Sequence, residues 1–551
     1  MLKRAVFLAL CAAATIRAQE QERQTFRLTT RLVPLDVLVH DKDGKPVADL
    51  SAADFKVFED GREQKVEFFQ INVARPTSAT ATPAPGRGGV PSGGTARALP
   101  ANQYSNRPNG AVPLTATVVL FDRLNTRFED QAQARSEIVQ VLGQIRPDER
   151  VALYVLESNT VRVIHDFSRD SAALVRAIAR YRAQSSPEQL AADAPPPPFE
   201  PIGVGGIDAE TEAWLKETTE QVANQYLRLR GQETLGALEQ IANHLAAIPG
   251  RKNLVWVSSA FPLTISERLG TQGPSIPESL SGPLTRAVNA ITTANVAIYP
   301  VDATGLVAPY SGVAPTATTV GIGRGTVQPA PNAIGTLAQR DANSDAMAAI
   351  AERTGGRMFR NTNAIGGAIA KAMDDGRVSY SLGYYPSNQK WDSKFRRLKV
   401  EVRRPGADAR YRSGYLALPA GSAKTESNLA DLARAALDAT AIGIIVNAEG
   451  SNLGIKVDPG GLTLRPNGNM FDVAIDVLIA HSMPNGDLLK SFDKTLNLRL
   501  SSEQRDQILQ EGFTMSRTVD IRPSASALHV VVRDAPSGRA GSVSIPIQKA
   551  R

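Results

Sequence analysis

The sequence predicts an α/β fold: a doubly wound, mostly parallel sheet flanked by an N-terminal β unit and a C-terminal β-sandwich. Two observations from the middle of the chain favour this fold. Continuous apolar runs are typical of buried parallel strands, and amphipathic segments of helical period alternate with them. A third observation is that strand patterns dominate the two ends of the chain. At 551 residues the chain is also longer than one hydrophobic core usually serves.

The first strands are expected in residues 26–75. Apolar and polar residues alternate in VLVHD and FKVFED, and turns at Gly44 and Gly61 separate the strand patterns. About four strands fit into this stretch, which makes a small β unit. Residues 76–113 are rich in Pro and Gly and lack apolar periodicity, so they are expected to form a linker.

The central α/β domain is expected at 114–417. Its buried strands follow the apolar runs TATVVLFD, RVALYVLE, NLVWVSS and VAIYPVDA, and insertions interrupt it at 185–208 and 304–340. Three further strand patterns, SYSLGYYPS, RRLKVEVRRP and RYRSGYLAL, are expected to close this same domain. Residues 432–551 predict a second all-β module, a β-sandwich with one short helix at 502–511.

Residues 1–18 have the pattern of a cleaved secretory signal peptide. A basic start is followed by an apolar stretch too short to span a bilayer, and Ala18 precedes a polar run. The single cysteine, Cys11, lies inside this stretch. Two alternatives are a buried N-terminal helix and lipid attachment at Cys11, and the bulky Leu10 disfavours the second. The exported chain, periplasmic or extracellular, would then contain no disulfide and no thiolate metal site.

The composition excludes some classes of partner. Lys and Arg number 62 against 55 Asp and Glu, and no run of basic residues forms a nucleic-acid patch. Aromatic residues make up 5% of the chain, too few to suggest stacking platforms for single-stranded nucleic acid. A protein partner is therefore favoured over a nucleic acid, and no transmembrane segment is expected in the mature chain.

The candidate site residues follow the ends of the apolar runs, because doubly wound sheets bind ligands beyond the carboxyl ends of their strands. The polar side chains expected at that edge are Asp122, Asn125, Thr126, Thr234, Ser258, Ser259 and Asp302. Structural roles remain open for three of them. Asp122 could cap the turn that follows it, Thr234 could be a helix N-cap in a glycine-flanked turn, and Asp302 could bind its neighbouring loop.

These residues resemble the metal-ion-dependent adhesion site of von Willebrand factor A domains. That family binds its cation through Asp-x-Ser-x-Ser after the first strand, a Thr from a second loop and an Asp from a third. Asp122, Thr126 and Thr234 match the Asp, the second Ser and the Thr. Leu124 and Ser259 stand where the family has a Ser and an Asp.

The resemblance implies a site for Mg²⁺ or another divalent cation, because its ligands are all oxygens. With Leu124 and Ser259 in place, the site is degenerate, and we expect binding to be weak or absent. Four further residues are expected to support the direct ligands without binding the cation themselves: Asn125, Ser258, Ser259 and Asp302. Asp302 ends the strand expected next but one to that of Asp122, about 10 Å away.

A wider resemblance covers nearly the whole mature chain. The segments VLVHDKDGKPVADLSAADFKVFEDG, LFDRLNT, NLVWVSSAFP, IAERTGGRMF, YSLGYYP and RSGYLA are similar to exported bacterial VWFA-related domain proteins. This resemblance implies a von Willebrand factor A-like domain with β modules on either side.

Three functions compete at this stage. The favoured one is a non-enzymatic, adhesion-type protein that binds a protein partner at the carboxyl edge of the A-type sheet. The first alternative is an architectural envelope protein with no ligand there. The second is a hydrolase, which is disfavoured because the five histidines are isolated and no nucleophile–base motif occurs.

The leader pattern predicts the N-terminus of the native protein. Mass spectrometry of the chain purified from its own cells should find Gln19, or a residue close to it, as the first residue. An intact Met1 or a lipid on Cys11 would contradict this prediction.

Overall fold

The structure is a computed structural model. It describes residues 32–73, 99–107, 116–146, 149–158, 160–182, 184–187, 190, 209–261, 278–304, 333–360, 365–419 and 429–547. The expected signal peptide at 1–18 and most of the insertions at 185–208 and 304–340 lie outside these residues. Helix α6 (Ala333–Thr354) begins inside the second expected insertion.

A five-stranded sheet, in the order β10-β9-β6-β7-β8, forms the centre of the α/β domain. We call this domain, residues 116–375 from β6 to α7, the A-type domain. Four strands are parallel, and β8 at the edge is antiparallel to β7. This confirms the predicted mostly parallel sheet. The chain winds outward in opposite directions from β6 and β9, so these two strands form the switch point of the sheet. The strands are β6 (Ala116–Asp122), β7 (Val151–Glu157), β8 (Thr160–Ser168), β9 (Lys252–Ser258) and β10 (Val296–Asp302).

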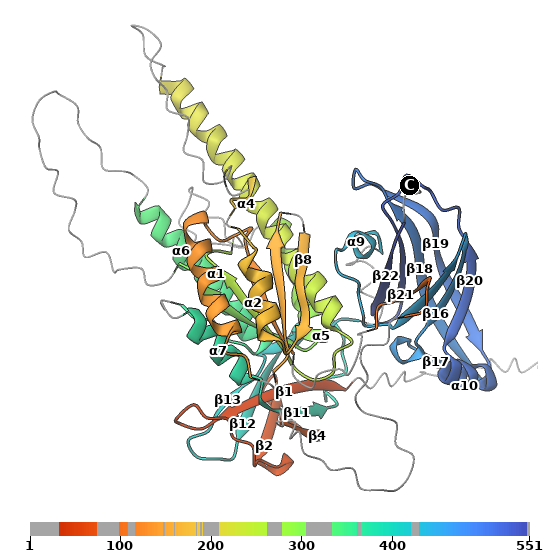
Figure 1. Ribbon diagram of the computed structural model, residues 1–551. Coiled ribbons are helices and arrows are strands. Elements are labelled where there is room, and N and C mark those ends of the chain that lie inside the picture. The colour runs from red at the N-terminus through yellow and green to blue at the C-terminus, as the bar shows by residue number, and fades with distance from the viewer. Residues whose placement is uncertain are drawn as a thin grey trace, which may run out of the picture.

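Helices cover both faces of this sheet, which explains why every residue of β6 and β9 is buried (Figure 1). Ile138, Leu174 and Ile369, from α1, α2 and α7, pack in one hydrophobic core. Leu238 and Ile291, from α4 and α5, pack in the other core, together with residues of α6. The helices not yet bounded are α1 (Phe128–Leu142), α2 (Ser171–Ala179), α4 (Ala209–Leu245), α5 (Glu278–Thr293) and α7 (Ile365–Asp375).

The strands after α7 do not belong to the A-type sheet, contrary to the boundary expected at 417. They pair with the N-terminal strands in two sheets, β13-β1-β11-β4 and β14-β12-β2-β3. Val37, Val57, Tyr380 and Leu398 share the core between these sheets. We call this double sheet the β module. Its strands are β1 (Val33–His40), β2 (Phe55–Glu59), β3 (Arg62–Gln64), β4 (Val66–Val73), β11 (Val378–Tyr384), β12 (Phe395–Val402), β13 (Asp408–Arg410) and β14 (Gly414–Leu416).

The physical reason for this pairing is burial. Among themselves the N-terminal strands form one short antiparallel ladder, β2 with β3, which is too little to enclose a core. In β12, buried and exposed residues mostly alternate, as in a sheet with one solvated face, whereas β6 and β9 are buried throughout. The A-type domain is therefore inserted between β4 and β11 of the β module.

The C-terminal module is a β-sandwich, with sheets β20-β16-β15-β5 and β17-β18-β21-β22 and with β19 beside β18. Its core contains Val446, Ile455, Val477 and Val530. The helix predicted at 502–511 is α10. The elements are β15 (Ile444–Glu449), β16 (Asn452–Val457), β17 (Arg465–Asn467), β18 (Met470–Ser482), β19 (Leu488–Leu500), α10 (Ser502–Glu511), β20 (Phe513–Thr518), β21 (Ala527–Asp534) and β22 (Ala540–Pro546).

One strand of this sandwich comes from the segment expected to be a linker, 76–113. Strand β5 (Gln103–Ser105) pairs with β15 at the edge of the sandwich. Asn106 then donates to the backbone oxygens of Ala439 and Ile442. Three residues are too few to produce a strand pattern in the sequence, which explains why this one was not predicted.

The segment that leads into the sandwich also binds the A-type domain. It follows the short helix α9 (Leu429–Arg434), and Leu437 belongs to the core beneath α4. The Thr440 hydroxyl accepts from the backbone N–H of Ala247 at 3.0 Å. The backbone oxygen of Asp438 lies 2.8 Å from Nδ1 of His244 on α4. The sandwich is thus attached to the C-terminal end of α4.

Among the described residues, no helix combines the length and the apolar character that crossing a membrane requires.

Gly356 gives a test of the packing between α6 and β10. A Cβ atom at this position would lie 1.9 Å from the backbone oxygen of Ile298, which cannot move without disturbing β10. We expect Gly356→Ala to lower the free energy of unfolding by roughly 1–3 kcal/mol or more. Gly236, inside α4, has nothing within 4 Å of the same position. Gly236→Ala should therefore be stabilising, by about 1 kcal/mol. Chemical denaturation checks both variants, and equal effects would contradict the packing described here.

Candidate functional site

The candidate site is built around the carboxyl group of Asp122, the last residue of the central strand β6. The side chain is fully buried. Oδ1 accepts from the backbone N–H of Asn125 at 2.9 Å. Oδ2 accepts from the Asn125 amide, the Trp256 indole N–H and the Ser258 hydroxyl, each at 2.9 Å. Protein donors therefore satisfy both oxygens of this carboxyl group.

The electrostatics of Asp122 follow from this burial. Loss of solvent has the largest effect and raises the pKa of the carboxyl group, while the hydrogen bonds from Asn125, Trp256 and Ser258 partly oppose that rise. The nearest cationic group in this network is Arg230, which is buried and donates from Nε to Oδ1 of Asn125 at 3.3 Å. Its positive charge polarises the amide that donates to Asp122.

Thr234 joins the same network from α4. Its hydroxyl donates to the backbone oxygen of Arg230 at 2.7 Å and accepts from the Asn125 amide at 2.8 Å. It stands inside the helix Ala209–Leu245, so the glycine-flanked turn and the N-cap role considered from the sequence are both wrong. The helix nevertheless brings Thr234 to Asp122, through Asn125.

Thr126 lies in the same loop as Asn125, and its backbone N–H donates to the Asp122 backbone oxygen at 3.2 Å. Its hydroxyl oxygen is buried and makes no hydrogen bond to any described residue. Of the three ligands that the resemblance implies, Thr126 alone has a side-chain oxygen with no protein partner among the described residues.

The remaining predicted residues are divided between the network and its surroundings. Ser258 belongs to the network, whereas Leu124 is fully buried in the hydrophobic core beside α4. Ser259 turns away and donates to Asp130 on α1 at 2.9 Å. Asp302 accepts from the backbone N–H and the hydroxyl of Thr304, at 2.9 and 2.6 Å. This matches the local role considered for Asp302, with β9 lying between its strand and that of Asp122.

Sequence reasoning did not identify Trp256, Arg230 or Asp130. A signal existed for Trp256, because it lies two residues before Ser258 and therefore on the same face of β9. Arg230 lies one helical turn before Thr234, which placed it on the same face of α4. Asp130 could not be found in this way, because its contact with Ser259 joins residues 129 positions apart.

The described residues do not fit a divalent cation at this edge well. Mg²⁺ needs several oxygen ligands directed at one point, whereas Asp122 already accepts three hydrogen bonds at Oδ2 and one at Oδ1 from protein donors. No group of three or more His, Cys, Asp or Glu side chains within the described ranges is arranged to hold a metal ion.

Beside this network, a second polar cluster fixes the segment that follows α2. Arg123 donates to Glu157 at 2.6 Å and to Gln184 at 3.1 Å, and its guanidinium lies 5.0 Å from the centre of the Tyr181 ring. The Tyr181 hydroxyl also donates to Glu157. These contacts hold Tyr181 and Gln184 against the carboxyl edge of the sheet.

Comparisons with known proteins add likenesses of fold. No protein-family model matches the sequence, and no curated protein matches it. Among solved structures, an aerotolerance-related membrane protein from Bacteroides fragilis is similar, with a TM-score of 0.24 and 11% identity over 47% of this chain and 98% of that chain. The vWF domain of the type V pili tip protein Mfa5 from Porphyromonas gingivalis has a TM-score of 0.18 and 13% identity, over 32% of this chain and 48% of that chain.

The pilus adhesin SpaC from Lactobacillus rhamnosus GG, in its open conformation, has a TM-score of 0.27 and 8% identity. That match covers 81% of this chain and 58% of the adhesin chain. Likenesses at this level concern the fold alone. The description of the A-type domain rests on its own strand order and helix layers.

The hydrogen bonds around Asp122 predict weak metal binding. We expect calorimetry on the full mature chain to give a dissociation constant for Mg²⁺ or Mn²⁺ in the millimolar range, or no binding, because a cation would have to displace donors from Asp122. Asp122→Ala should leave this result unchanged. A micromolar affinity that disappears in Asp122→Ala would show that the degenerate site still binds metal, contrary to this prediction.

Proposed function

We propose that this chain is an exported, non-enzymatic binding protein whose A-type domain contacts a protein partner at the carboxyl edge of its sheet, without a metal ion. The observation that carries the proposal is a set of exposed apolar side chains at that edge and on the helix that projects beyond it. Phe128 directly follows the Asp122 loop and is 55% exposed. Trp214, in the N-terminal half of α4, is 62% exposed.

Helix α4 connects the buried network to this exposed surface. Its C-terminal half carries Thr234 and packs in the core of the A-type domain, whereas its N-terminal half projects beyond the body of the domain (Figure 1). Val222 and Leu229, on the projecting part, are 48% and 38% exposed. Exposed large apolar side chains grouped on one feature are typical of protein interaction sites.

The network around Asp122 supports metal-independent binding. In an adhesion site of the complete type, an acidic group of the partner completes the coordination of the cation. Here Asn125, Trp256 and Ser258 donate to Oδ2 of Asp122, and the Asn125 backbone donates to Oδ1, so a cation would have to compete with these donors for the carboxyl group. We therefore assign recognition to the apolar side chains around the edge, and a structural role to Asp122.

The hydrolase alternative finds little support in the geometry. Two serine–histidine contacts occur among the described residues, His481–Ser491 and His529–Ser544, both at 3.1 Å. Nε2 of His481 accepts from the backbone N–H of Arg522 at 3.4 Å, which leaves the proton on Nδ1, facing Ser491. The Ser544 hydroxyl donates to Asp438 at 2.8 Å instead of to His529. In neither pair can the histidine take the serine proton, as a nucleophile–base pair requires.

The experiment compares apolar surfaces at two places on the molecule. The full mature chain is immobilised, and proteins retained from an envelope extract of the native cells are quantified with and without chelator. We expect Phe128→Ser together with Trp214→Ser to reduce a specific retained protein at least tenfold, because both substitutions remove exposed apolar contact area. The chelator should have no effect.

Leu509 on α10 supplies the matched control, since it is 50% exposed but belongs to the C-terminal sandwich. Leu509→Ser should retain the partner at the wild-type level. Loss of the partner in chelator would show that binding needs a metal. If the amount of the retained protein is the same with the double substitution, or if no protein is specifically retained, the architectural alternative is favoured.

A further inference from the structure

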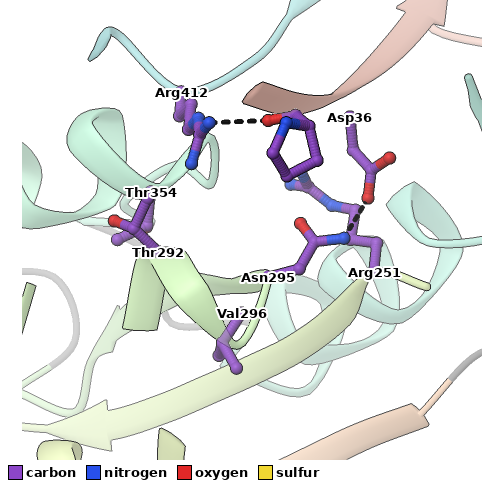
Figure 2. Close-up of a pocket in the computed structure, with 8 residues that line it drawn as sticks. Asp36, Arg251, Thr292, Asn295, Val296, Thr354 and Arg412 are labelled. Carbon is purple, nitrogen blue, oxygen red and sulfur yellow. Dashed lines mark hydrogen bonds between the residues drawn. The ribbon is translucent and has the colours of Figure 1, made fainter. Parts of the chain in front are cut away.

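A small cavity lies where the β module meets the A-type domain, at the amino ends of β9 and β10 and therefore at the opposite edge from Asp122. Its volume is about 20 Å³, room for one or two particles of the size of a water molecule. Figure 2 shows the side chains around it, which come from both parts of the chain. The cavity is lined by Pro34, Asp36, Arg251, Thr292, Asn295, Val296, Thr354 and Arg412.

The two arginines of this cavity bind neutral acceptors. Arg251 is 6% exposed and donates from Nη2 to the Tyr299 hydroxyl and the Gly355 backbone oxygen, at 3.1 and 2.6 Å. Arg412 donates from Nη2 to the Pro34 backbone oxygen at 2.6 Å. The Nε atoms of Arg251 and Arg412 are buried and have no hydrogen-bond partner among the described residues.

A third basic residue, Lys252, follows Arg251 in the chain at the start of β9, outside the lining of the cavity. Lys252 is 2% exposed, and its Nζ donates to the Ile248 backbone oxygen at 2.8 Å. Burial lowers the pKa of Lys252 to about 8, while the nearby Asp36 acts in the opposite direction. The carboxylate of Asp36 accepts from the Asn295 amide and the Ser381 hydroxyl.

The other buried carboxylate of this interface is already shared. Asp375 lies 2.5 Å from Arg410, 3.4 Å from His40 and 3.9 Å from Arg357. Among the residues that line the cavity, two arginines, Arg251 and Arg412, therefore stand against the single carboxylate of Asp36, and Lys252 adds a buried basic group beside the lining. Buried charge without a counter-charge is costly, so a site of this kind favours an anion.

We propose that the cavity binds a small monovalent inorganic anion of the halide class, with chloride as the physiological ion, and that this anion joins the β module to the A-type domain. The two unpartnered Nε–H groups and the excess positive charge supply its recognition. A volume of about 20 Å³ suits one small ion. Because Arg251 comes from the A-type domain and Arg412 from the β module, the bound ion contacts both parts.

The test measures halide binding in two ways. In the first, thermal unfolding of the full mature chain is followed in mixtures of sodium chloride and sodium gluconate at constant ionic strength. A ligand that binds only the folded state raises Tm with its concentration. We expect Tm to rise with the logarithm of the chloride concentration, and bromide to have the same effect.

Arg412→Met should abolish this dependence, because it removes the donor that the β module contributes. Arg357→Met is the matched control. It removes a cation from the same interface but outside the cavity, and it should keep the wild-type dependence on chloride. Equal chloride dependence of Tm in wild type and Arg412→Met would overturn the proposal. A wild-type Tm that does not change with the chloride concentration would overturn it too.

The second measurement does not depend on any variant. Crystals of the wild-type chain grown with bromide should give an anomalous peak between Arg251 and Arg412. A cavity that holds only water, with bromide absent or bound elsewhere, would contradict the assignment.

Discussion

The buried carboxyl group of Asp122 is the constraint on which the carboxyl edge of the sheet depends. A carboxyl group at the end of the central strand has lost all contact with water, so protein groups have to supply its hydrogen bonds. Those groups come from the loop after β6 and from β9, while Asn125 continues the chain of contacts to Thr234 and Arg230 on α4. Loss of one donor would leave a buried acceptor unsatisfied, which typically costs about 1–3 kcal/mol. The switch point of the sheet, where doubly wound folds bind ligands, is closed here by the protein itself.

The sequence predicted the elements of this fold better than their partners. Continuous apolar runs identified β6, β7, β9 and β10, because strands that are buried on both faces carry apolar side chains on both faces. The pattern of a strand reveals which of its faces are buried but not which strand lies beside it. Tyr380 of β11 therefore looked like part of the domain that precedes it in sequence, whereas it pairs with Val37 of β1 and packs in the core of the β module. The boundary expected at 417 was wrong for this reason.

The candidate site was predictable where it depends on strand ends and not where it depends on contacts between distant segments. Asp122 and Ser258 were found because each ends a buried strand, and the structure joins them by a hydrogen bond. Thr234 was found by resemblance, although its local structure was misjudged. The pairing of Ser259 with Asp130 depends on how the helix after β6 packs beside β9, which no local pattern encodes. Whether Asp122, Thr126 and Thr234 bind a cation stays a prediction, and the occupied oxygens of Asp122 favour the negative answer.

The insertion of the A-type domain between β4 and β11 determines which edge of its sheet contacts the β module. Helix α7 ends at Asp375, only three residues before β11 begins at Val378. Asp375 is held there by Arg410 and His40 from the β module. Burial raises the pKa of its carboxyl group, but the hydrogen bond from His40 and the charges of Arg410 and Arg357 more than offset this rise and lower the pKa. A folded-state pKa below the ordinary value means that this contact stabilises the fold at neutral pH, and that the stabilisation is lost as the pH falls through the folded-state pKa. The last helix of the A-type domain is thus tied to the β module at the same edge as the cationic cavity. Among the described residues, the contacts between modules gather at the amino edge of the sheet, whereas the proposed function rests on Phe128 and the projecting half of α4, at and beyond its carboxyl edge.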